Sequence, residues 1–240
     1  TAGKNKWPVV IWLHEYSYAQ GIANKGSLIN AFLDAGIAVC IYDQLGFGTR
    51  NEEEARLFYQ RYPKWSKMGR MVADVRWALD ALMENERIDA GKIFVAGYSI
   101  GAATGLYSAA LDERIAGVVS VCGFTPMRTN TEGKTAEGIY EYSHLHGLIP
   151  KLGFFAGMEE RIPYDFHEIL ACIAPRPMLV IAPTWDQYAN HTDISRCMDE
   201  VKKVYSLLDA GESVSFHTPD DYNRLSPAMQ KQVTDWLSAR

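Results

Sequence analysis

The sequence predicts an α/β protein with a mainly parallel sheet and helices on both of its faces. Short β-branched apolar runs alternate with segments of helical periodicity, which is the pattern of such a sheet. No linker, repeat or low-complexity stretch divides the 240 residues. A chain of this length buries roughly 70% of its unfolded surface, so it can form a core without disulfides or a structural metal. We therefore expect a single domain over residues 1–240.

Six short apolar runs are the candidate strands of this sheet. Their aliphatic and β-branched residues follow one another with little polar interruption, which is typical of strands that are covered on both faces. They span residues 8–13, 37–42, 93–96, 117–121, 178–182 and 214–217.

Three segments with apolar residues at steps of three and four predict amphipathic helices. The first carries its stripe on Trp65, Met68, Val72, Val75, Leu79 and Leu82. The second begins near Asp193, a suitable N-cap, stops at Gly211, and carries Ile194, Cys197, Val201, Val204, Tyr205 and Leu208. The third begins with Ser226 as N-cap and Pro227 as first helical residue, and carries Met229, Val233, Trp236 and Leu237.

The stretch 125–170 interrupts this alternation. It has weak periodicity and contains glycine, proline and aromatic residues, yet it stands between two core strands. Long irregular insertions at the strand ends of an open sheet usually form lids or pocket walls. We expect a lid or cap here.

Charge and hydropathy exclude two classes of partner. Lys and Arg number 24 against 29 Asp and Glu, a net charge of −5, and the basic residues are scattered, so a nucleic acid is not expected. The longest apolar runs, such as 178–182, are far shorter than the roughly 20 residues of a membrane span, which predicts a soluble protein without a membrane partner. The start of the chain shows no apolar signal region. The compartment, whether secreted, periplasmic or cytoplasmic, and the oligomeric state stay open.

No residue pattern points to a cofactor or a metal. The four cysteines lack Cys-x-x-Cys spacing, and Cys40 and Cys122 lie in apolar strand-like runs, where they are interpreted as buried small hydrophobic residues. His144-x-His146 has ligand-like spacing, but no third ligand stands near it. We expect neither cofactor nor metal, and we assign the two histidines to the surface of the lid.

A nucleophile motif follows the third candidate strand. Gly97-Tyr98-Ser99-Ile100-Gly101 stands after the run 93–96 and before a run of small residues that suits a closely packed helix start. This is G-x-S-x-G in its strand–turn–helix context, where the serine occupies a strained turn and the glycines let strand and helix approach each other. A glycine-rich turn with an incidental serine is the alternative.

With this motif the chain, from Trp7 to the closing helix, resembles the α/β-hydrolase superfamily. Within it the chain is similar to the branch of dienelactone hydrolases and acetyl xylan esterases, and less similar to the catalytic domain of prolyl-oligopeptidase-type peptidases. The resemblance implies Ser99 as the nucleophile of a serine esterase that forms an acyl-enzyme. The first antiparallel strands of the superfamily have no counterpart before Trp7, which is the expectation for the C-terminal part of a longer protein.

The resemblance also implies an oxyanion hole. One amide is that of Ile100, directly after the serine. The other comes from the loop His14-Glu15-Tyr16-Ser17-Tyr18, in which Tyr16 holds the corresponding position. Two amides aimed at the developing oxyanion contribute about 2.7 to 4 kcal/mol each. His14 is expected to support this loop without reacting.

The acid of the superfamily follows the penultimate strand, and here Pro183-Thr184-Trp185-Asp186 indicates Asp186. Its task is to fix the tautomer of the catalytic imidazole. Trp185 beside it is expected to contact the substrate. Asp193 is a second candidate for the acid, whereas Asp43 matches a structural turn of the superfamily.

The histidine is where the sequence departs from its relatives. They carry it after the last strand in a Pro-Gly-Gly-His pattern, but the corresponding Pro219-Asp220-Asp221-Tyr222 places a tyrosine there. A tyrosine with an ordinary pKa near 10 is a poor base at neutral pH. We expect His217, at the end of the last candidate strand, to be the base, with a strand-end residue of no catalytic role as the alternative. His191, His144 and His146 are further candidates.

Together these residues predict a serine hydrolase that cleaves a carboxylic ester. The aromatic residues near the expected pocket suit a sugar ring or an aromatic acyl group, so a carbohydrate-linked or short acyl ester is the expected substrate. They are Tyr140, Tyr142, Phe154, Phe155, Trp185 and Tyr188. Two alternatives stay open. One is an oligopeptidase-like peptidase domain. The other is a non-catalytic binding protein, which Tyr222 favours because a general base contributes roughly 10² to 10⁴ in rate.

Overall fold

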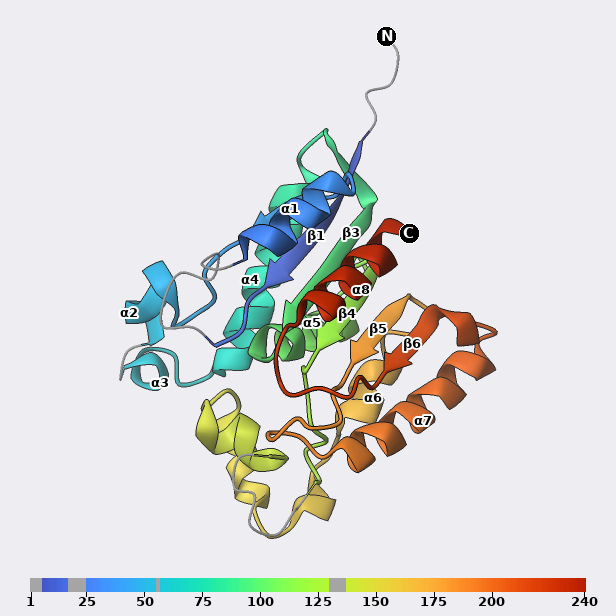
Figure 1. Cartoon of the computed structure of the whole chain (residues 1–240). Coiled ribbons are helices and arrows are strands. Elements are labelled where there is room, and N and C mark those ends of the chain that lie inside the picture. Colours follow the sequence, from blue (N-terminus) through green and yellow to red (C-terminus); the bar gives the residue numbers. More distant parts are fainter. Residues whose placement is uncertain (1–5, 17–24, 55–56, 130–136) are drawn as a thin grey trace.

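A six-stranded sheet forms the centre of the protein (Figure 1). The computed structural model describes residues 6–16, 25–54, 57–129 and 137–240, and the statements below concern this part of the chain. The strand order is β2-β1-β3-β4-β5-β6, and every neighbouring pair is parallel. The strands are β1 (Trp7–Leu13), β2 (Ala38–Ile41), β3 (Ile88–Tyr98), β4 (Gly117–Val121), β5 (Met178–Ile181) and β6 (Val214–His217). The predicted fold class is confirmed.

The strands lie where the apolar runs predict them. The largest difference is at β3, which begins at Ile88 instead of residue 93, because Ile88 pairs with Trp7 across a register shift in the ladder between β1 and β3. Side chains of β4 and β5 are buried throughout on both faces, as are those of β1 from Val9 and of β3 from Ile93 to Gly97. This double burial explains their nearly continuous apolar sequence.

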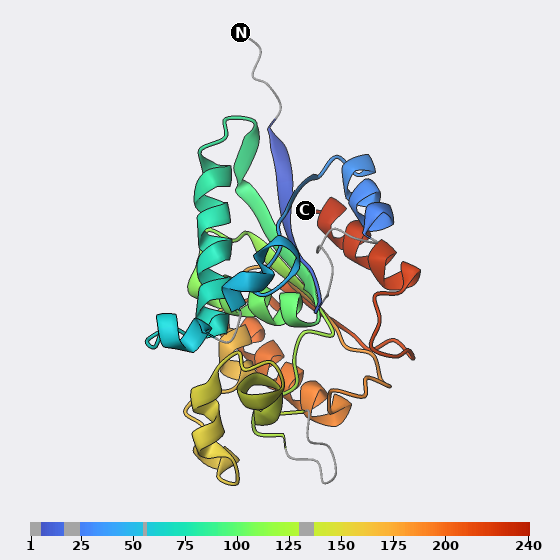
Figure 2. The same cartoon turned by 90° about the vertical axis from the view of Figure 1, so that its left-hand side faces the viewer.

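Helices cover the two faces of the sheet unequally (Figure 2). On one face lie α1 (Gly26–Asp34) and α8 (Pro227–Ser238), whose Phe32 and Val233 share a core cluster with Trp12. On the other face a larger cluster joins the sheet to α4 (Lys67–Met83), α5 (Ile100–Leu111), α6 (Phe166–Ala171) and α7 (His191–Leu207). Two short helices, α2 (Asn51–Glu54) and α3 (Phe58–Arg61), and the 3-10 turn η1 (Gly48–Arg50) lie between β2 and α4.

One of the two predicted helix starts holds, and the other is corrected. Ser226 caps α8 by accepting a hydrogen bond from the Met229 amide at 3.4 Å, with Pro227 as first helical residue. The second predicted helix, α7, begins at His191 rather than Asp193. Its cap is Asn190, which accepts from the Asp193 amide at 3.2 Å. It ends at Leu207, ahead of Gly211, which begins the 3-10 turn η5 (Gly211–Ser213).

The stretch 125–170 extends beyond the carboxyl ends of the strands (yellow in Figure 1). It contains a short π-helix η2 (Glu141–Leu145), the 3-10 turns η3 (Pro150–Phe155) and η4 (Glu159–Arg161), and most of α6. Tyr142 is fully buried, and its ring packs against Phe166. This aromatic residue therefore serves the core of the stretch itself. Residues 130–136 of this stretch lie outside the described part of the chain.

No helix among the described residues is both long enough and apolar enough to cross a membrane.

Candidate active site

Ser99 stands on the tight turn between β3 and α5. Its backbone adopts φ 54° and ψ −124°, a left-handed conformation that non-glycine residues rarely take. The Ser99 amide donates a hydrogen bond of 2.9 Å to the carbonyl of Val121 in the neighbouring strand. The turn is thereby tied to the carboxyl edge of the sheet, in the geometry that the G-x-S-x-G motif predicts.

Gly97 and Gly101 allow strand and helix to meet at this turn. A Cβ on Gly97 would lie 2.5 Å from the carbonyl carbon of Gly101, and a Cβ on Gly101 would overlap the carbonyl group of Leu13. No side chain larger than hydrogen fits at either position. The spacing of the two glycines is thus explained by the close crossing of β1, β3 and α5.

The two residues predicted to supply the oxyanion-hole amides are Ile100, directly after Ser99, and Tyr16, in the same pocket as Ser99. Ile100 is the first residue of α5, so its amide has no acceptor within the helix. Its side chain lines a second cavity on the other side of Tyr16. Tyr16 lines the pocket that also holds Ser99, and its ring contacts Phe47 edge-on and stacks on His146. Ser17 and Tyr18 of this loop lie outside the described residues.

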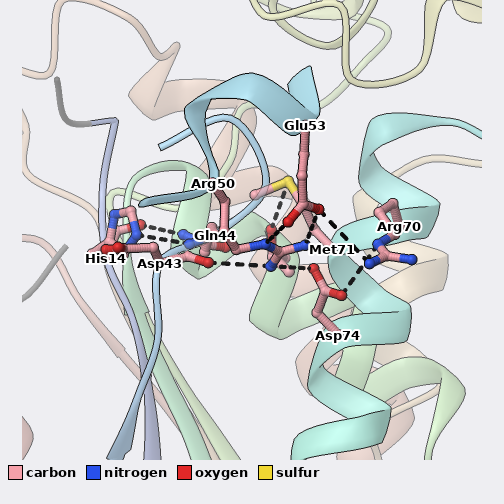
Figure 3. Close-up of polar contacts among 9 residues, drawn as sticks. His14, Asp43, Gln44, Arg50, Glu53, Arg70, Met71 and Asp74 are labelled. Atoms are coloured by element: carbon pink, nitrogen blue, oxygen red, sulfur yellow. Dashed lines mark hydrogen bonds and ion pairs between the residues drawn. The ribbon is translucent and has the colours of Figure 1, made fainter. Parts of the chain in front are cut away.

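His14 supports the loop that carries Tyr16. The fully buried ring accepts a hydrogen bond from the Gln44 amide at Nε2 (3.1 Å) and donates one from Nδ1 to the Glu15 carbonyl (2.7 Å). The Gln44 side chain donates to the His14 carbonyl at 2.5 Å (Figure 3). Burial lowers the pKa of His14, which favours the neutral ring that these two bonds require. His14 therefore has the supporting role predicted for it.

Charged residues tie the segment after β2 to helix α4 (Figure 3). Arg50 donates to the Asp43 carbonyl at 3.1 Å and pairs with Asp74 at 2.8 Å, and Arg70 approaches the other oxygen of Asp74 at 3.3 Å. The Asp43 carboxylate accepts the amide and the hydroxyl of Thr49, both at 2.9 Å. Asp43 thus closes a structural turn, as the sequence predicts.

A cavity of about 280 Å³ opens beside Ser99. It lies between the carboxyl ends of the central strands and the π-helix η2. The residues that line it are Tyr16, Ser99, Cys122, Phe124, Glu141, Leu145, His146, Asp186, Tyr188, Ala189 and Asn223. Within the described part of the chain, this lining includes two carboxyl groups and no lysine or arginine.

Asp186 lies in the loop after β5, where only 9% of its surface is exposed. Its Oδ1 accepts the Tyr188 amide at 2.9 Å, and its Oδ2 accepts the side-chain amide of Asn223 at 2.8 Å. Asn223 Oδ1 in turn accepts the hydroxyl of Tyr98 at 2.7 Å. A triad histidine would donate to the acid at the place that Asn223 occupies.

Neither His217 nor Tyr222, the two positions considered for the base after the last strand, lines the pocket. The position that faces the acid is Asn223, one residue after Tyr222, whose ring is 60% exposed and packs edge-on against Trp185. His217 is the last residue of the edge strand β6, its side chain is exposed, and it does not line the pocket. Because β6 stays in the sheet through His217, whose carbonyl accepts the Ala182 amide, the chain returns to Asp186 only at Asn223.

The other residues considered for substrate contact or for the base differ in whether they line the pocket. Trp185, expected to contact substrate, is 53% exposed and lies beside the pocket without lining it. His191 begins α7 outside the pocket lining, and His144 hydrogen-bonds Ser143 at 2.6 Å and lines the second cavity. His146 lines both cavities.

Besides Asn223, two titratable residues of the pocket were not predicted as pocket residues from the sequence. Cys122 lies after the end of β4, at φ 49°, and is half-buried in the wall of the pocket instead of fully buried in a strand. Its partial burial raises the pKa of the thiol. Glu141 begins the π-helix η2, and burial together with the charge of Asp186 raises the pKa of its carboxyl to about 8. A position at the end of a parallel strand could have drawn attention to Cys122, whereas a π-helix has no recognisable sequence pattern.

Comparisons with known proteins agree on one family. The sequence profile described as "Glucuronyl esterase, fungi" matches residues 1–209. Carbohydrate esterase MZ0003, from an unknown prokaryotic organism, is 26% identical over 151 residues, which are 62% of this chain and 35% of that protein. The 4-O-methyl-glucuronoyl methylesterase 1 of Wolfiporia cocos is 24% identical over 197 residues, covering 72% of this chain and 47% of its own.

A solved structure shares the fold over almost the whole chain. The CE15 glucuronoyl esterase from Teredinibacter turnerae superimposes with a TM-score of 0.76 at 17% sequence identity, covering 98% of this chain and 66% of that one. The chain spans about half or less of the length of the curated relatives it matches.

Proposed function

The chain belongs to the fungal glucuronyl esterase family, and on that premise we propose that it hydrolyses a carboxylic ester of a carbohydrate, with Ser99 as the nucleophile. The observation that carries the proposal is the position of Ser99 on a strained turn in the same pocket as Asp186. Strained backbone at a polar residue in a cavity is typical of a catalytic site, because the fold must stabilise it at a cost.

The chemistry follows from the groups around Ser99. The Ser99 hydroxyl attacks the acyl carbon, and the ester carbonyl oxygen becomes an oxyanion that the amides of Ile100 and Tyr16 stabilise. The alcohol then leaves, and water releases the acid from the acyl-enzyme. The amide of Ile100, with no acceptor in its helix, supports this assignment.

The charge of the pocket supports a neutral ester of a sugar acid as the substrate. A uronic acid is uncharged as an ester and anionic after hydrolysis. The described lining offers Asp186 and Glu141 but no lysine or arginine, so an ester enters more easily than a carboxylate does. The names of the relatives, a carbohydrate esterase and a glucuronoyl methylesterase, point to the same class. A cavity of about 280 Å³ suits one sugar unit better than a longer chain.

A second candidate function is the binding of such a carbohydrate without hydrolysis. The observation in its favour is the Asn223 side chain, which meets Asp186 where a histidine would be needed to accept a proton. An amide cannot serve as a general base near neutral pH, and loss of the base costs roughly 10² to 10⁴ in rate.

Hydrolysis of methyl glucuronate separates the two functions. We expect methanol release that is abolished in Ser99→Ala, with the exposed Ser238→Ala, at the end of α8, as a matched serine control of full activity. Saturable binding of the ester with no turnover above that of Ser99→Ala would favour the binding protein.

A further inference from the structure

Ser99 needs a group that takes its proton, and the Asn223 amide beside Asp186 cannot do so. We propose that Glu141 is this group: its carboxylate accepts the Ser99 proton and later returns it to the leaving alcohol. The inference rests on the proposed function, because it concerns the same pocket and the same reaction. Glu141 lies outside the three segments, after β3, β5 and β6, that hold Ser99, Asp186 and Asn223.

The fold holds Glu141 firmly at the pocket wall. The next residue, Tyr142, is fully buried, and its hydroxyl lies 3.3 Å from both the amide and the carbonyl of Thr125. The Tyr142 carbonyl accepts the Ile149 amide at 2.8 Å. The π-helix η2 is therefore fixed to the loop after β4, and π-helical turns occur frequently at functional sites.

The carboxyl group of Glu141 has no structural task in the described part of the chain. It makes no hydrogen bond or ion pair with the described residues, although neighbouring Glu159 and Glu168 both bind backbone amides. Its side chain is only partly exposed, and it lines the pocket together with Ser99. A carboxyl group that lines a cavity and takes part in no structural contact among the described residues is available to a bound substrate.

The surroundings of Glu141 suit proton transfer near neutral pH. Burial is the main cause that raises its pKa to about 8, and the charge of Asp186 from the loop after β5 adds to it. A general base works best when its pKa lies near the working pH. The other titratable groups that line the same pocket are Tyr16, Cys122, His146 and Tyr188.

Each proton and each electron pair that moves in this reaction has a donor and an acceptor. As the Ser99 oxygen bonds to the acyl carbon, its proton passes to Glu141, and the carbonyl electron pair moves to the oxyanion. When the oxyanion collapses, the bond to the alcohol breaks and Glu141 donates the proton to the alcohol oxygen. In the second half of the reaction the water oxygen bonds to the acyl carbon while Glu141 takes a proton from the water. The bond to the Ser99 oxygen then breaks and Glu141 returns the proton to that oxygen, which leaves the free acid and the starting enzyme.

His146 is the rival for this role, since it also lines the pocket. Its ring stacks on Tyr16 with 5.5 Å between centroids and an interplanar angle of 29°, in the wall between the two cavities. The variants Glu141→Gln and His146→Gln distinguish the two groups, because only the variant of the true base loses the pH-dependent rise in rate.

The test compares Glu141→Gln with Glu160→Gln, an exposed glutamate of the same stretch. We expect kcat/KM of the unchanged protein for methyl glucuronate to rise with pH and to reach its half-maximum near pH 8. Glu141→Gln should lower kcat/KM at least 100-fold and abolish this rise, whereas Glu160→Gln should retain both. In an Asn223→His background the loss caused by Glu141→Gln should shrink to less than 10-fold, because the imidazole then accepts the proton.

Two results would overturn the inference while leaving the proposed function intact. One is a Glu141→Gln protein that keeps its ester kcat/KM and its pH profile. The other is a pH-dependent rise in kcat/KM that disappears in His146→Gln and persists in Glu141→Gln. Glu141→Gln is expected to fold, because the amide has the shape of the protonated carboxyl group. Thermal unfolding checks this. The proposed function itself fails only if the unchanged protein shows no hydrolysis that depends on Ser99.

Discussion

Asn223 donates a hydrogen bond of 2.8 Å from its side-chain amide to the carboxylate of Asp186. The same amide group accepts the Tyr98 hydroxyl, so its orientation is fixed from both ends. The acid of the pocket thus has a partner that holds it in place but cannot carry a proton away from Ser99. The pocket thus joins a strained serine to a buried aspartate whose hydrogen-bonded neighbour at residue 223 is an amide, which cannot act as a base.

Asn223→His is expected to raise ester hydrolysis by Ser99. The imidazole would stand next to Asp186, which would fix its tautomer and stabilise the imidazolium. We expect kcat/KM for methyl glucuronate to increase by about 10- to 100-fold at pH 7, measured beside Asn223→Gln, which adds length without a base. An Asn223→His protein that is folded and no more active than Asn223→Gln would show that residue 223 does not face the reacting serine.

His217→Ala and Tyr222→Phe are expected to change the rate less than about twofold. His217 ends an edge strand with its side chain exposed, and Tyr222 packs on the outer face of Trp185. Exposed side chains away from a site usually affect stability by no more than about 0.5 kcal/mol. Steady-state ester hydrolysis checks both, and a loss of two orders of magnitude in His217→Ala would restore that residue as the base.

Gly101→Ala is expected to destabilise the fold, and Gly26→Ala is its matched control. The new methyl group at Gly101 would overlap the Leu13 carbonyl, whereas at Gly26, the first residue of α1, it meets nothing within 4 Å. Forced overpacking costs roughly 1 to 3 kcal/mol or more, which lowers the melting temperature by several degrees. Equal melting temperatures for the two variants would contradict the close crossing of β1 and α5.

The sequence predicts those parts of the structure that depend on residues close together in the chain, and it misses those that depend on tertiary contacts. The six strands and the turn at Ser99 follow from apolar runs and from two glycines whose Cβ atoms would have no room. Asn223 was missed by one residue, because the length of the loop after β6 is set by contacts with Trp185 and Asp186 that no local pattern encodes. Glu141 was missed because a π-helix and the burial of its carboxyl arise only from tertiary packing.

Glu141 should also make folding stability depend on pH. Its carboxyl pKa is raised from an ordinary 4.5 to about 8, so between these values the folded protein retains a proton that the unfolded chain has lost. Unfolding then releases a proton, and the stability contributed by the neutral carboxyl falls as the pH rises from about 4.5 to 8. Glu141→Gln should therefore unfold at a higher temperature than the unchanged protein at pH 8.5, with a much smaller difference at pH 4.5. Thermal melts at both pH values check this, and an equal difference at both would contradict the raised pKa.

The free acid is expected to bind more weakly than its neutral analogue. Glucuronate carries a charge toward Asp186 and Glu141, whereas glucuronamide has the same shape without the charge. Competition against methyl glucuronate at pH 8.5 should give an inhibition constant for glucuronate at least tenfold higher than that for glucuronamide. Tighter binding of the anion would mean that a cationic group reaches the pocket.

The reactivity of Ser99 is tested most directly by a fluorophosphonate probe that bonds only to an activated serine. The account predicts one adduct per chain, located on the Ser99 peptide by mass spectrometry and absent from Ser99→Ala, with labelling that quickens as the pH rises toward 8. A folded protein that takes up no probe at Ser99, or one that Ser99→Ala still labels to the same extent, would contradict it.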